Sequence, residues 1–271
     1  MGAVAPPRDL IERVAELVEQ VSTSVIETRF AALAGADVRE KSPGELVTDA
    51  DVEGERLLTA GLVGLWPGTP VVGEEACAND PALFDALNAE WAWLVDPIDG
   101  TGNFVSGSTE WAVMVGLHRN RETVMSWIWQ PMHRRMYVAE RGAGATVDGV
   151  PLVSAPRPAD ESALRGAVLR RFLDTETLAR VDANVARFGE VTAGRMCAGT
   201  EYPAIVEGEQ DFALFWRTLP WDHAPPVLLL TEAGGTARRP DGSPYHPSDA
   251  RVGLLVAANE GIWAKAVHLL D

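Results

Sequence analysis

The spacing of apolar residues predicts a helical N-terminal region. Between residues 9 and 34, apolar side chains recur every three or four positions and charged residues separate them. That period places the apolar side chains on one face of a long amphipathic helix, with Asp9 as its expected N-cap. A polar break follows at 39–44, and a second helix is predicted over 51–65.

Short apolar runs predict a sheet after these helices. The runs at 70–72 and 91–95 have the length of buried strands, and each is followed by acidic residues. From residue 110 to 147 the pattern changes to alternation, with turn residues between the runs. This pattern predicts a meandering antiparallel sheet.

The C-terminal part has a different pattern. Beyond a stretch at 151–158, apolar strands alternate with helical segments, which predicts an α/β layer. The strands are expected at 167–169, 212–215 and 252–256, and the helices at 175–188, 202–207, 222–233 and 261–269. A length of 271 residues predicts one large domain or two closely packed halves. With the division placed at 151–158, we expect a single domain, 1–271, with subdomains at about 1–155 and 156–271.

Charge and cysteine content exclude some partners. The chain has 23 Lys and Arg against 39 Asp and Glu, a net charge of −16. We expect no nucleic-acid polymer and no membrane surface as partner, because phosphate contacts need clustered cations. No signal peptide or bilayer-spanning run is seen, and Cys77 and Cys197 form no CxxC pair. The expectation is a cytoplasmic protein without disulfides or structural zinc.

Acidic residues gather at the ends of predicted strands and helices. They lie in four segments: Gly73-Glu74-Glu75, Asp96-Pro97-Ile98-Asp99-Gly100-Thr101, Trp221-Asp222 and Thr48-Asp49-Ala50-Asp51. In the second segment, a proline and an Asp-Gly turn can bring two carboxylates together. Like charges that close repel unless a cation lies between them, and oxygen ligands without His or Cys select Mg²⁺, Mn²⁺ or Ca²⁺. Backbone N–H groups at Gly100-Thr101 would suit a phosphate.

Each segment also has a structural explanation. Asp-Pro and Asp-Gly are ordinary turn formers, and Asp222 is an ordinary helix N-cap. Taken singly, Glu75, Asp49 and Asp222 favour that interpretation. The occurrence of all four segments in one order favours a site.

The run Trp93-Leu-Val-Asp-Pro-Ile-Asp-Gly-Thr-Gly-Asn-Phe104 resembles the signature of the inositol monophosphatase family. Gly73-Glu74-Glu75, the stretch 41–51, and Trp221-Asp222 with Glu232-Ala-Gly-Gly235 resemble its other motifs in the same order. The resemblance implies a metal-dependent phosphatase with an α+β, layered αβαβα sandwich of the sugar-phosphatase type. Its N-terminal sheet would be antiparallel and its C-terminal half α/β. The resemblance also implies a homodimer, for which the Trp-rich strands are a candidate interface.

The resemblance assigns metal ligands residue by residue. Glu74 and Asp96, with the carbonyl of Ile98, would hold a first Mg²⁺. Asp96, Asp99 and Asp222 would hold a second, and a third, weaker ion would lie near Glu74. Two or three Mg²⁺ ions are therefore expected, with Mn²⁺ as a substitute.

The same resemblance assigns the catalytic and substrate contacts. Thr101, assisted by Asp51, would polarise a metal-bound water, and Glu74 would contribute to catalysis through the metal. The phosphate ester is expected to contact Asp99, Gly100, Thr101 and Asp222.

The leading interpretation is a Mg²⁺-dependent phosphomonoesterase acting on a small polyol or sugar phosphate. Myo-inositol monophosphate is the first candidate. Histidinol phosphate, fructose 1,6-bisphosphate and a 3′-phosphorylated nucleotide are alternatives. A catalytically silent binding or regulatory homologue is the alternative from another class, and the complete ligand set argues against it.

Several positions depart from the family pattern. The stretch 215–220 lacks the acid that inositol-preferring members carry before the metal-binding Asp, so Arg217 is weighed as a contact for an anionic substrate, against an exposed, solvated arginine. His223 is expected on the helix surface, with the pocket wall as the alternative. Pro225-Pro226 are expected in the first turn of their helix. By the resemblance, Arg195 and Glu201 would face the substrate.

Overall fold

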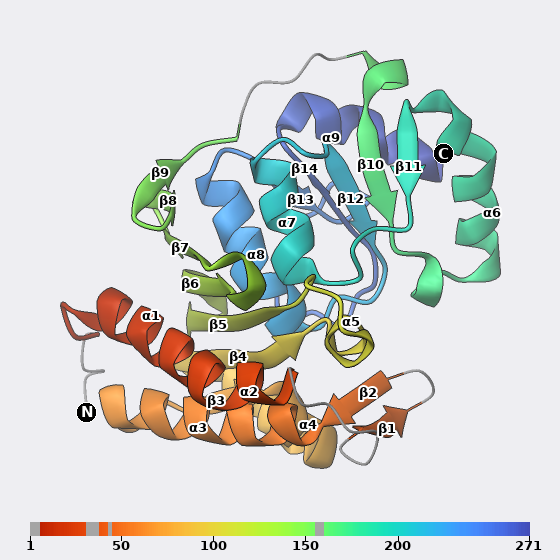
Figure 1. The fold of residues 1–271 in the computed structure, drawn as a ribbon. Coiled ribbons are helices and arrows are strands. Elements are labelled where there is room, and N and C mark those ends of the chain that lie inside the picture. The colour runs from red at the N-terminus through yellow and green to blue at the C-terminus, as the bar shows by residue number, and fades with distance from the viewer. Residues whose placement is uncertain (1–5, 31–37, 43–44, 155–159) are drawn as a thin grey trace.

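The computed structural model describes residues 6–30, 38–42, 45–154 and 160–271. In this part of the chain, helices and sheets alternate in layers (Figure 1). The helices are α1 (Leu10–Val21), α2 (Glu27–Phe30), α3 (Asp49–Leu65), α4 (Glu74–Asn79), α5 (Thr101–Ser106), α6 (Thr175–Asn184), α7 (Ala198–Val206), α8 (Pro220–Glu232) and α9 (Glu260–Ala266). α1 and α3 cover one face of a seven-stranded sheet. α7 and α8 lie between it and a five-stranded sheet, and α9 packs on the far side of the second sheet. The predicted αβαβα sandwich is confirmed.

The larger sheet follows the order of the chain. Its strands are β3 (Val71–Gly73), β4 (Trp91–Asp99), β5 (Ala112–Arg119), β6 (Glu122–Gln130), β7 (Arg135–Glu140), β8 (Gly144–Val147) and β9 (Val150–Leu152). From β4 onward the pairing is antiparallel, as predicted, but β3 runs parallel to β4. The wholly antiparallel prediction is therefore wrong at this edge. A crossover through α4 and the 3₁₀ helix Pro81–Asn88 returns the chain to the same end of the sheet, which a hairpin cannot do.

The smaller sheet is mixed. In spatial order its strands are β11 (Glu190–Thr192), β10 (Arg165–Val168), β12 (Phe212–Phe215), β14 (Leu254–Ala257) and β13 (Thr236–Arg238). β10 is parallel to both of its neighbours, and β14 is antiparallel to β12 and β13. The chain passes from one sheet to the other between β9 and β10. The subdomain boundary at about residue 155 stays a prediction, and residues 155–159 lie outside the described part.

The N-terminal region differs from the prediction in two places. The helix expected over 9–34 is α1, a π-helical turn (Ser22–Ile26) and α2, with residues 31–34 outside the described part, and Asp9 makes no side-chain capping bond. Within the expected polar break at 39–44, residues up to 42 belong to β1 (Val38–Ser42), which pairs with β2 (Glu45–Thr48). Ion pairs, not an apolar face, accompany this hairpin, so hydrophobic periodicity does not reveal it.

The tryptophans belong to the core under α1 and α3. Trp93, Trp111 and Trp127 are fully buried and pack with apolar side chains of the two helices. These three side chains are covered by the chain itself, so they are not available to the predicted dimer interface. Among the described residues, no helix has the length and apolar character that a membrane crossing requires.

The helices between the sheets begin earlier than predicted. α7 starts at Ala198 rather than at residue 202, and α8 starts at Pro220 rather than at 222. Pro225 and Pro226 consequently lie in the second turn of α8, so their predicted place in the first turn is wrong. Because proline has no N–H, the carbonyls four residues earlier lose their usual helical donors.

Candidate active site

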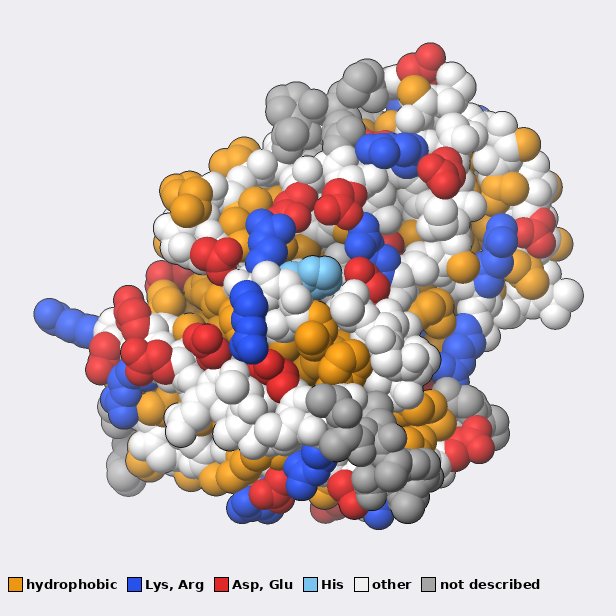
Figure 2. Space-filling model, in the orientation of Figure 1, with side chains coloured by type: hydrophobic (Ala, Val, Ile, Leu, Met, Phe, Trp, Pro, Cys, Tyr) orange, Lys and Arg blue, Asp and Glu red, His pale blue; other side chains and the backbone are white. Residues whose placement is uncertain are grey.

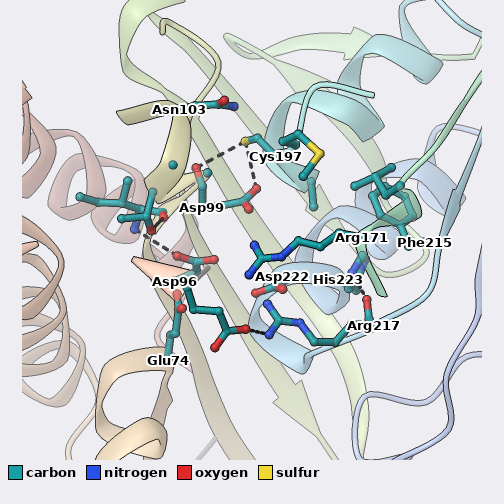
Figure 3. Close-up of a pocket in the computed structure, with 18 of the residues that line it drawn as sticks. Glu74, Asp96, Asp99, Asn103, Arg171, Cys197, Phe215, Arg217, Asp222 and His223 are labelled. Atoms are coloured by element: carbon teal, nitrogen blue, oxygen red, sulfur yellow. Dashed lines mark hydrogen bonds and ion pairs between the residues drawn. The ribbon is translucent and has the colours of Figure 1, made fainter. Parts of the chain in front are cut away.

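A cavity of about 340 Å³ opens where β3 and β4 end, and the loops after β10 and β12 form its opposite side (Figure 3). The structure places seven of the eight predicted site residues in its wall. These are Glu74, Asp96, Ile98, Asp99, Gly100, Thr101 and Asp222. The eighth, Asp51, lies behind the wall and contacts Thr101.

Glu74 is held at the start of α4 by a residue that the sequence analysis missed. The Glu55 carboxylate accepts hydrogen bonds from the backbone N–H groups of Glu75 (2.7 Å) and Ala76 (2.8 Å). This contact requires Gly73, because a Cβ there would lie 2.4 Å from the Glu55 carboxyl carbon. The signal was present in the sequence: Glu55 follows Asp51 by four positions, so both acids lie on one face of α3.

The end of β4 turns Asp96 and Asp99 toward the same cavity. The pairing with β5 shifts register between the two aspartates, and the Ile98 N–H donates to Asp96 Oδ1 (3.1 Å). Gly100 then adopts φ 85°, the left-handed conformation that glycine tolerates best. A Cβ there would also lie 3.0 Å from both Cys197 Cβ and the Glu110 carbonyl oxygen. The predicted sharp turn at Asp99-Gly100 is confirmed.

Thr101 is linked to Asp51 through its hydroxyl group. Thr101 Oγ1 lies 3.2 Å from Asp51 Oδ1 and 3.0 Å from the Ile98 carbonyl oxygen. The other carboxylate oxygen of Asp51 accepts from the N–H (2.7 Å) and the hydroxyl (2.6 Å) of Thr48, the N-cap of α3. Burial raises the pKa of Asp51 to about 6, although the Thr48 hydrogen bonds oppose this shift. Asp51 is thus fixed in position, with one oxygen directed at Thr101.

The aspartates of the cavity are crowded with negative charge. Burial raises the pKa of Asp96 and of Asp222 well above the usual range, and the charge of Glu74 raises both further. Burial also raises the pKa of Asp99 to about 6, although a hydrogen bond from the Gly199 N–H (2.5 Å) opposes the shift. A bound cation would relieve this repulsion.

The donor set fits a hard divalent cation. Carboxylate and carbonyl oxygens are the ligands that Mg²⁺ prefers. In the structure the Lys41 ammonium binds two of these oxygens, donating to Glu74 Oε1 (2.8 Å) and to Glu75 Oε1 (2.5 Å). Burial lowers the pKa of Lys41, but the two glutamates raise it more, so the ammonium stays charged. Within the described ranges, no three Asp, Glu, His or Cys side chains form a ready-made metal-binding group. A metal ion at Glu74 would take over or share the oxygen that Lys41 binds.

The opposite wall of the cavity carries basic and aromatic side chains. Arg171 and Arg217 direct their guanidinium groups into the cavity (Figure 3), and Phe172 lines the same wall. The guanidinium carbons lie 4.8 Å and 4.3 Å from the centre of the Phe172 ring. Arg217 forms an ion pair with Glu45, and its side chain is 36% exposed, so the expectation of a solvated arginine is wrong.

Sequence comparison identifies the family. The model of the inositol monophosphatase family matches residues 8–270. The chain belongs to the inositol monophosphatase family. Members of the family are metal-dependent hydrolases of phosphomonoesters, so the chain is a phosphatase.

Individual relatives agree with this assignment. The inositol-1-monophosphatase of Rhizobium meliloti is 30% identical over 88% of this chain and 87% of its own. Inositol monophosphatase 2 of Solanum lycopersicum is 31% identical over 85% of this chain and 88% of its own. The solved structure of the extragenic suppressor protein suhB from Bartonella henselae has a TM-score of 0.80 at 22% identity, over 96% of this chain and 98% of that one, and shows the same fold.

Two residues that the inositol monophosphatase resemblance assigned to the substrate lie elsewhere. Arg195 forms ion pairs with Glu110 (3.2 Å) and Glu209, and its backbone N–H donates to Glu201 (2.5 Å). Neither Arg195 nor Glu201 lines the cavity, so this expectation is wrong. Glu201 is fully buried and also accepts from Gln210, so both residues hold the loop before α7 in place.

His223 is buried between α8 and the neighbouring elements and does not lie on the surface of α8. Its Nε2 lies 3.2 Å from the Arg217 carbonyl oxygen, and its Nδ1 lies 3.0 Å from the Tyr202 hydroxyl. A carbonyl only accepts, so Nε2 carries the proton and Nδ1 accepts from Tyr202. Burial lowers the pKa of His223 to about 3, which keeps the ring neutral. His223 therefore ties the backbone at Arg217 to the helix that carries Asp222.

Proposed function

We propose that this phosphatase hydrolyses a small polyol or sugar phosphate to the alcohol and inorganic phosphate, with Mg²⁺ as its metal. One observation carries the proposal: carboxylates from three separate segments face a single cavity beside the hydroxyl group of Thr101, which Asp51 holds. The complete set of carboxylates argues against a catalytically silent homologue. On the face drawn in Figure 2, the described basic side chains are interspersed with acidic ones, which does not favour a nucleic-acid polymer as partner.

The carboxylates are the proposed metal ligands. Glu74, Asp96 and the Ile98 carbonyl would hold one Mg²⁺, and Asp96, Asp99 and Asp222 would hold a second. A third, weaker ion is proposed near Glu74, and Mn²⁺ is a proposed substitute. When bound, such ions supply Lewis-acid chemistry: they lower the pKa of water and offset negative charge on the phosphoryl oxygens.

The remaining residues bind and orient. If Thr101 Oγ1 donates its hydrogen to Asp51 Oδ1, the lone pairs of Oγ1 are available to accept a hydrogen bond from the attacking water. Thr48 anchors the other oxygen of Asp51, so this hydrogen bond has a fixed direction. The N–H groups of Gly100 and Thr101 are proposed to hold the phosphate oxygens, so that the ester bond faces the attacking water.

The relatives suggest which esters to test. Myo-inositol monophosphate is the first candidate, because proteins named inositol-1-monophosphatase occur in Bacillus subtilis (28% identical) and Rhizobium meliloti. Fructose 1,6-bisphosphate is the second. A protein of Aquifex aeolicus named fructose-1,6-bisphosphatase/inositol-1-monophosphatase is 25% identical over 92% of this chain and 90% of its own. Histidinol phosphate and 3′-phosphorylated nucleotides stay predictions, as do a homodimer and a cytoplasmic location.

Phosphate release in the presence and absence of metal tests the proposal. We expect the purified protein to release inorganic phosphate from at least one of these esters with Mg²⁺, and to release none after chelation. Readdition of Mg²⁺ should restore the rate. Full activity in chelator, or no release from any ester of the panel with Mg²⁺ or Mn²⁺, would contradict the proposed reaction.

A further inference from the structure

We propose that Arg171 and Arg217 form a subsite for a second anionic group of the substrate, so that esters with a carboxylate or phosphate on the leaving group are preferred over esters whose leaving group is an uncharged polyol. The inference rests on the proposed function and refines it. The two arginines, together with Phe172, are called the basic wall below.

The basic wall is part of the cavity that contains the carboxylates. Arg171 belongs to the 3₁₀ helix Arg170–Phe172 after β10, and Arg217 precedes α8. Figure 3 shows both guanidinium groups pointing from these loops toward the side on which Asp96 and Asp222 lie. A phosphate ester bound beside Thr101 would therefore extend its leaving group toward the arginines. Arginine binds carboxylate and phosphate through paired N–H groups, which makes these anions the natural ligands.

Contacts with neighbouring side chains fix the position of Arg217. Its guanidinium group lies 4.3 Å from the centre of the Phe172 ring, and its carbonyl oxygen accepts a hydrogen bond from the buried His223. Tyr202, itself fully buried, fixes His223 from the other side. Stacking and a fixed backbone reduce the rotamer freedom that an arginine loses when it binds a ligand.

A carboxylate of the chain itself already forms an ion pair with Arg217. The side chain of Glu45, in β2, forms an ion pair with Arg217 Nη1 and also lines the cavity. This contact shows that an oxyanion can reach Arg217 from inside the cavity. A substrate carboxylate or phosphate would compete with Glu45 for the same guanidinium group.

Arg170 provides a matched control. It lies on the same 3₁₀ helix as Arg171, but it forms an ion pair with Asp182 (2.9 Å) and does not line the cavity. Replacing Arg170 removes one positive charge from the same segment and leaves the cavity wall unchanged.

Two pairs of esters isolate the second anion. Glycerol 3-phosphate and 3-phosphoglycerate differ by a carboxylate on the leaving group, and fructose 6-phosphate and fructose 1,6-bisphosphate differ by a second phosphate. We expect a lower KM for the member that carries the second anionic group in at least one pair. The pair that shows the difference identifies the anion as carboxylate or phosphate.

Substitutions should remove this preference selectively. In R171Q and R217Q, we expect KM for the ester with the second anionic group to rise roughly ten- to a hundredfold, while KM for its partner with an uncharged leaving group changes less than about threefold. R217K should retain part of the preference, R170Q all of it, and E45Q should lower KM for the ester with the second anionic group. Calorimetric Kd values for the same ligands should follow the same order, so the subsite can be measured without turnover.

Failure of this inference is distinguishable from failure of the proposed reaction. If the protein releases phosphate but shows no preference in either pair, the reaction stands and the subsite is refuted. Equal losses on both members of a pair in folded R217Q would also refute it, because they would mean that Arg217 only offsets the charge of nearby carboxylates. Absence of phosphate release would overturn the proposed reaction, while a calorimetric preference for 3-phosphoglycerate that R217Q abolishes would still support the subsite.

Discussion

The two sides of the cavity are built in different ways. The acidic side, defined as Glu74, Asp96, Ile98 and Asp99, comes from the ends of β3 and β4, where buried backbone, a register shift and glycines fix the carboxylates. The basic wall comes from loops after β10 and β12, where side chains stack on Phe172 and stay partly exposed. The comparison suggests a division of labour: chemistry depends on the rigid acidic side, and the choice of leaving group depends on the loops.

Substitutions on the acidic side should have the largest effects on activity, and that of Asp96 the largest of all. We expect D96N to reduce kcat by about a hundred- to a thousandfold, the range for loss of a group that stabilises developing charge. Because burial and neighbouring acids raise the pKa of Asp96, a neutral side chain should also raise the Tm in chelator, by roughly 2–4 °C for each kcal/mol of repulsion relieved. Phosphate release and thermal unfolding measure the two effects.

Asp49 supplies the control for this substitution. It lies at the exposed start of α3, forms an ion pair with Arg39 (2.7 Å) and does not line the cavity. D49N should leave kcat within about twofold of the wild-type value. A fully active D96N, or equal losses in the two variants, would refute the role assigned to the acidic side.

The backbone of the acidic side can be tested at Gly73. In G73A, the new Cβ would collide with the Glu55 carboxylate, so we expect a loss of about 1–3 kcal/mol in the free energy of unfolding and a lower affinity for Mg²⁺. G64A is the matched control, because a Cβ at this position in α3 meets nothing within 4 Å. Urea unfolding of both variants checks the prediction. Equal stabilities of the two would show that the close packing of Gly73 on Glu55 is unimportant.

Acidification should change the contribution that the sheet behind the acidic side makes to stability. It should leave the contribution of the basic wall unchanged, because guanidinium groups do not titrate near neutral pH. His118, buried in β5 with no hydrogen-bond partner among the described residues, has its pKa lowered to about 4 by burial and by Arg141. Between pH 6.5 and 4, His118 therefore binds a proton in the unfolded chain but not in the folded state, so the free energy of unfolding falls as the pH falls. From pH 7.5 to 5 this costs about 2 kcal/mol.

H118L should remove this contribution. Urea unfolding at the two pH values should show a smaller loss on acidification in H118L than in the wild type. The acids with raised pKa values act in the opposite direction, but both proteins contain them, so the difference isolates His118. Identical pH dependences would contradict the burial of a neutral histidine.

The end of β4, which supplies most of the acidic side, could be predicted from the sequence because its residues follow one another closely along the chain, whereas Glu74 and Asp222 were assigned by the family resemblance. Asp96, Ile98, Asp99, Gly100 and Thr101 come from one strand end, and local turn chemistry alone brings them together. The layered fold could also be predicted, from the change of hydrophobic period after residue 150 and the family resemblance. The strand β3 was predicted at 70–72, but its parallel direction was missed, because that direction depends on a crossover and not on the residues of the strand.

The basic wall could not be predicted in full for the opposite reason. Arg171 and Arg217 are 46 positions apart, and no local pattern distinguishes Arg171 from Arg170, which faces Asp182 instead. Their meeting depends on how β10 and β12 pair within the second sheet. The surface position expected for His223 was wrong because α8 lies between the two sheets and is buried on most sides. The alternative holds, since His223 lines the cavity.

A kinetic comparison of D96N and R217Q on one matched pair of esters tests the division of labour most directly. Phosphate release from the two esters of the pair that shows the preference, each measured over a range of concentrations with Mg²⁺, gives kcat and KM for both variants and the wild type. We expect D96N to lose kcat on both esters, whereas R217Q should keep kcat and lose affinity only for the ester with the second anionic group. Retained kcat in D96N, or a uniform loss on both esters in R217Q, would contradict it.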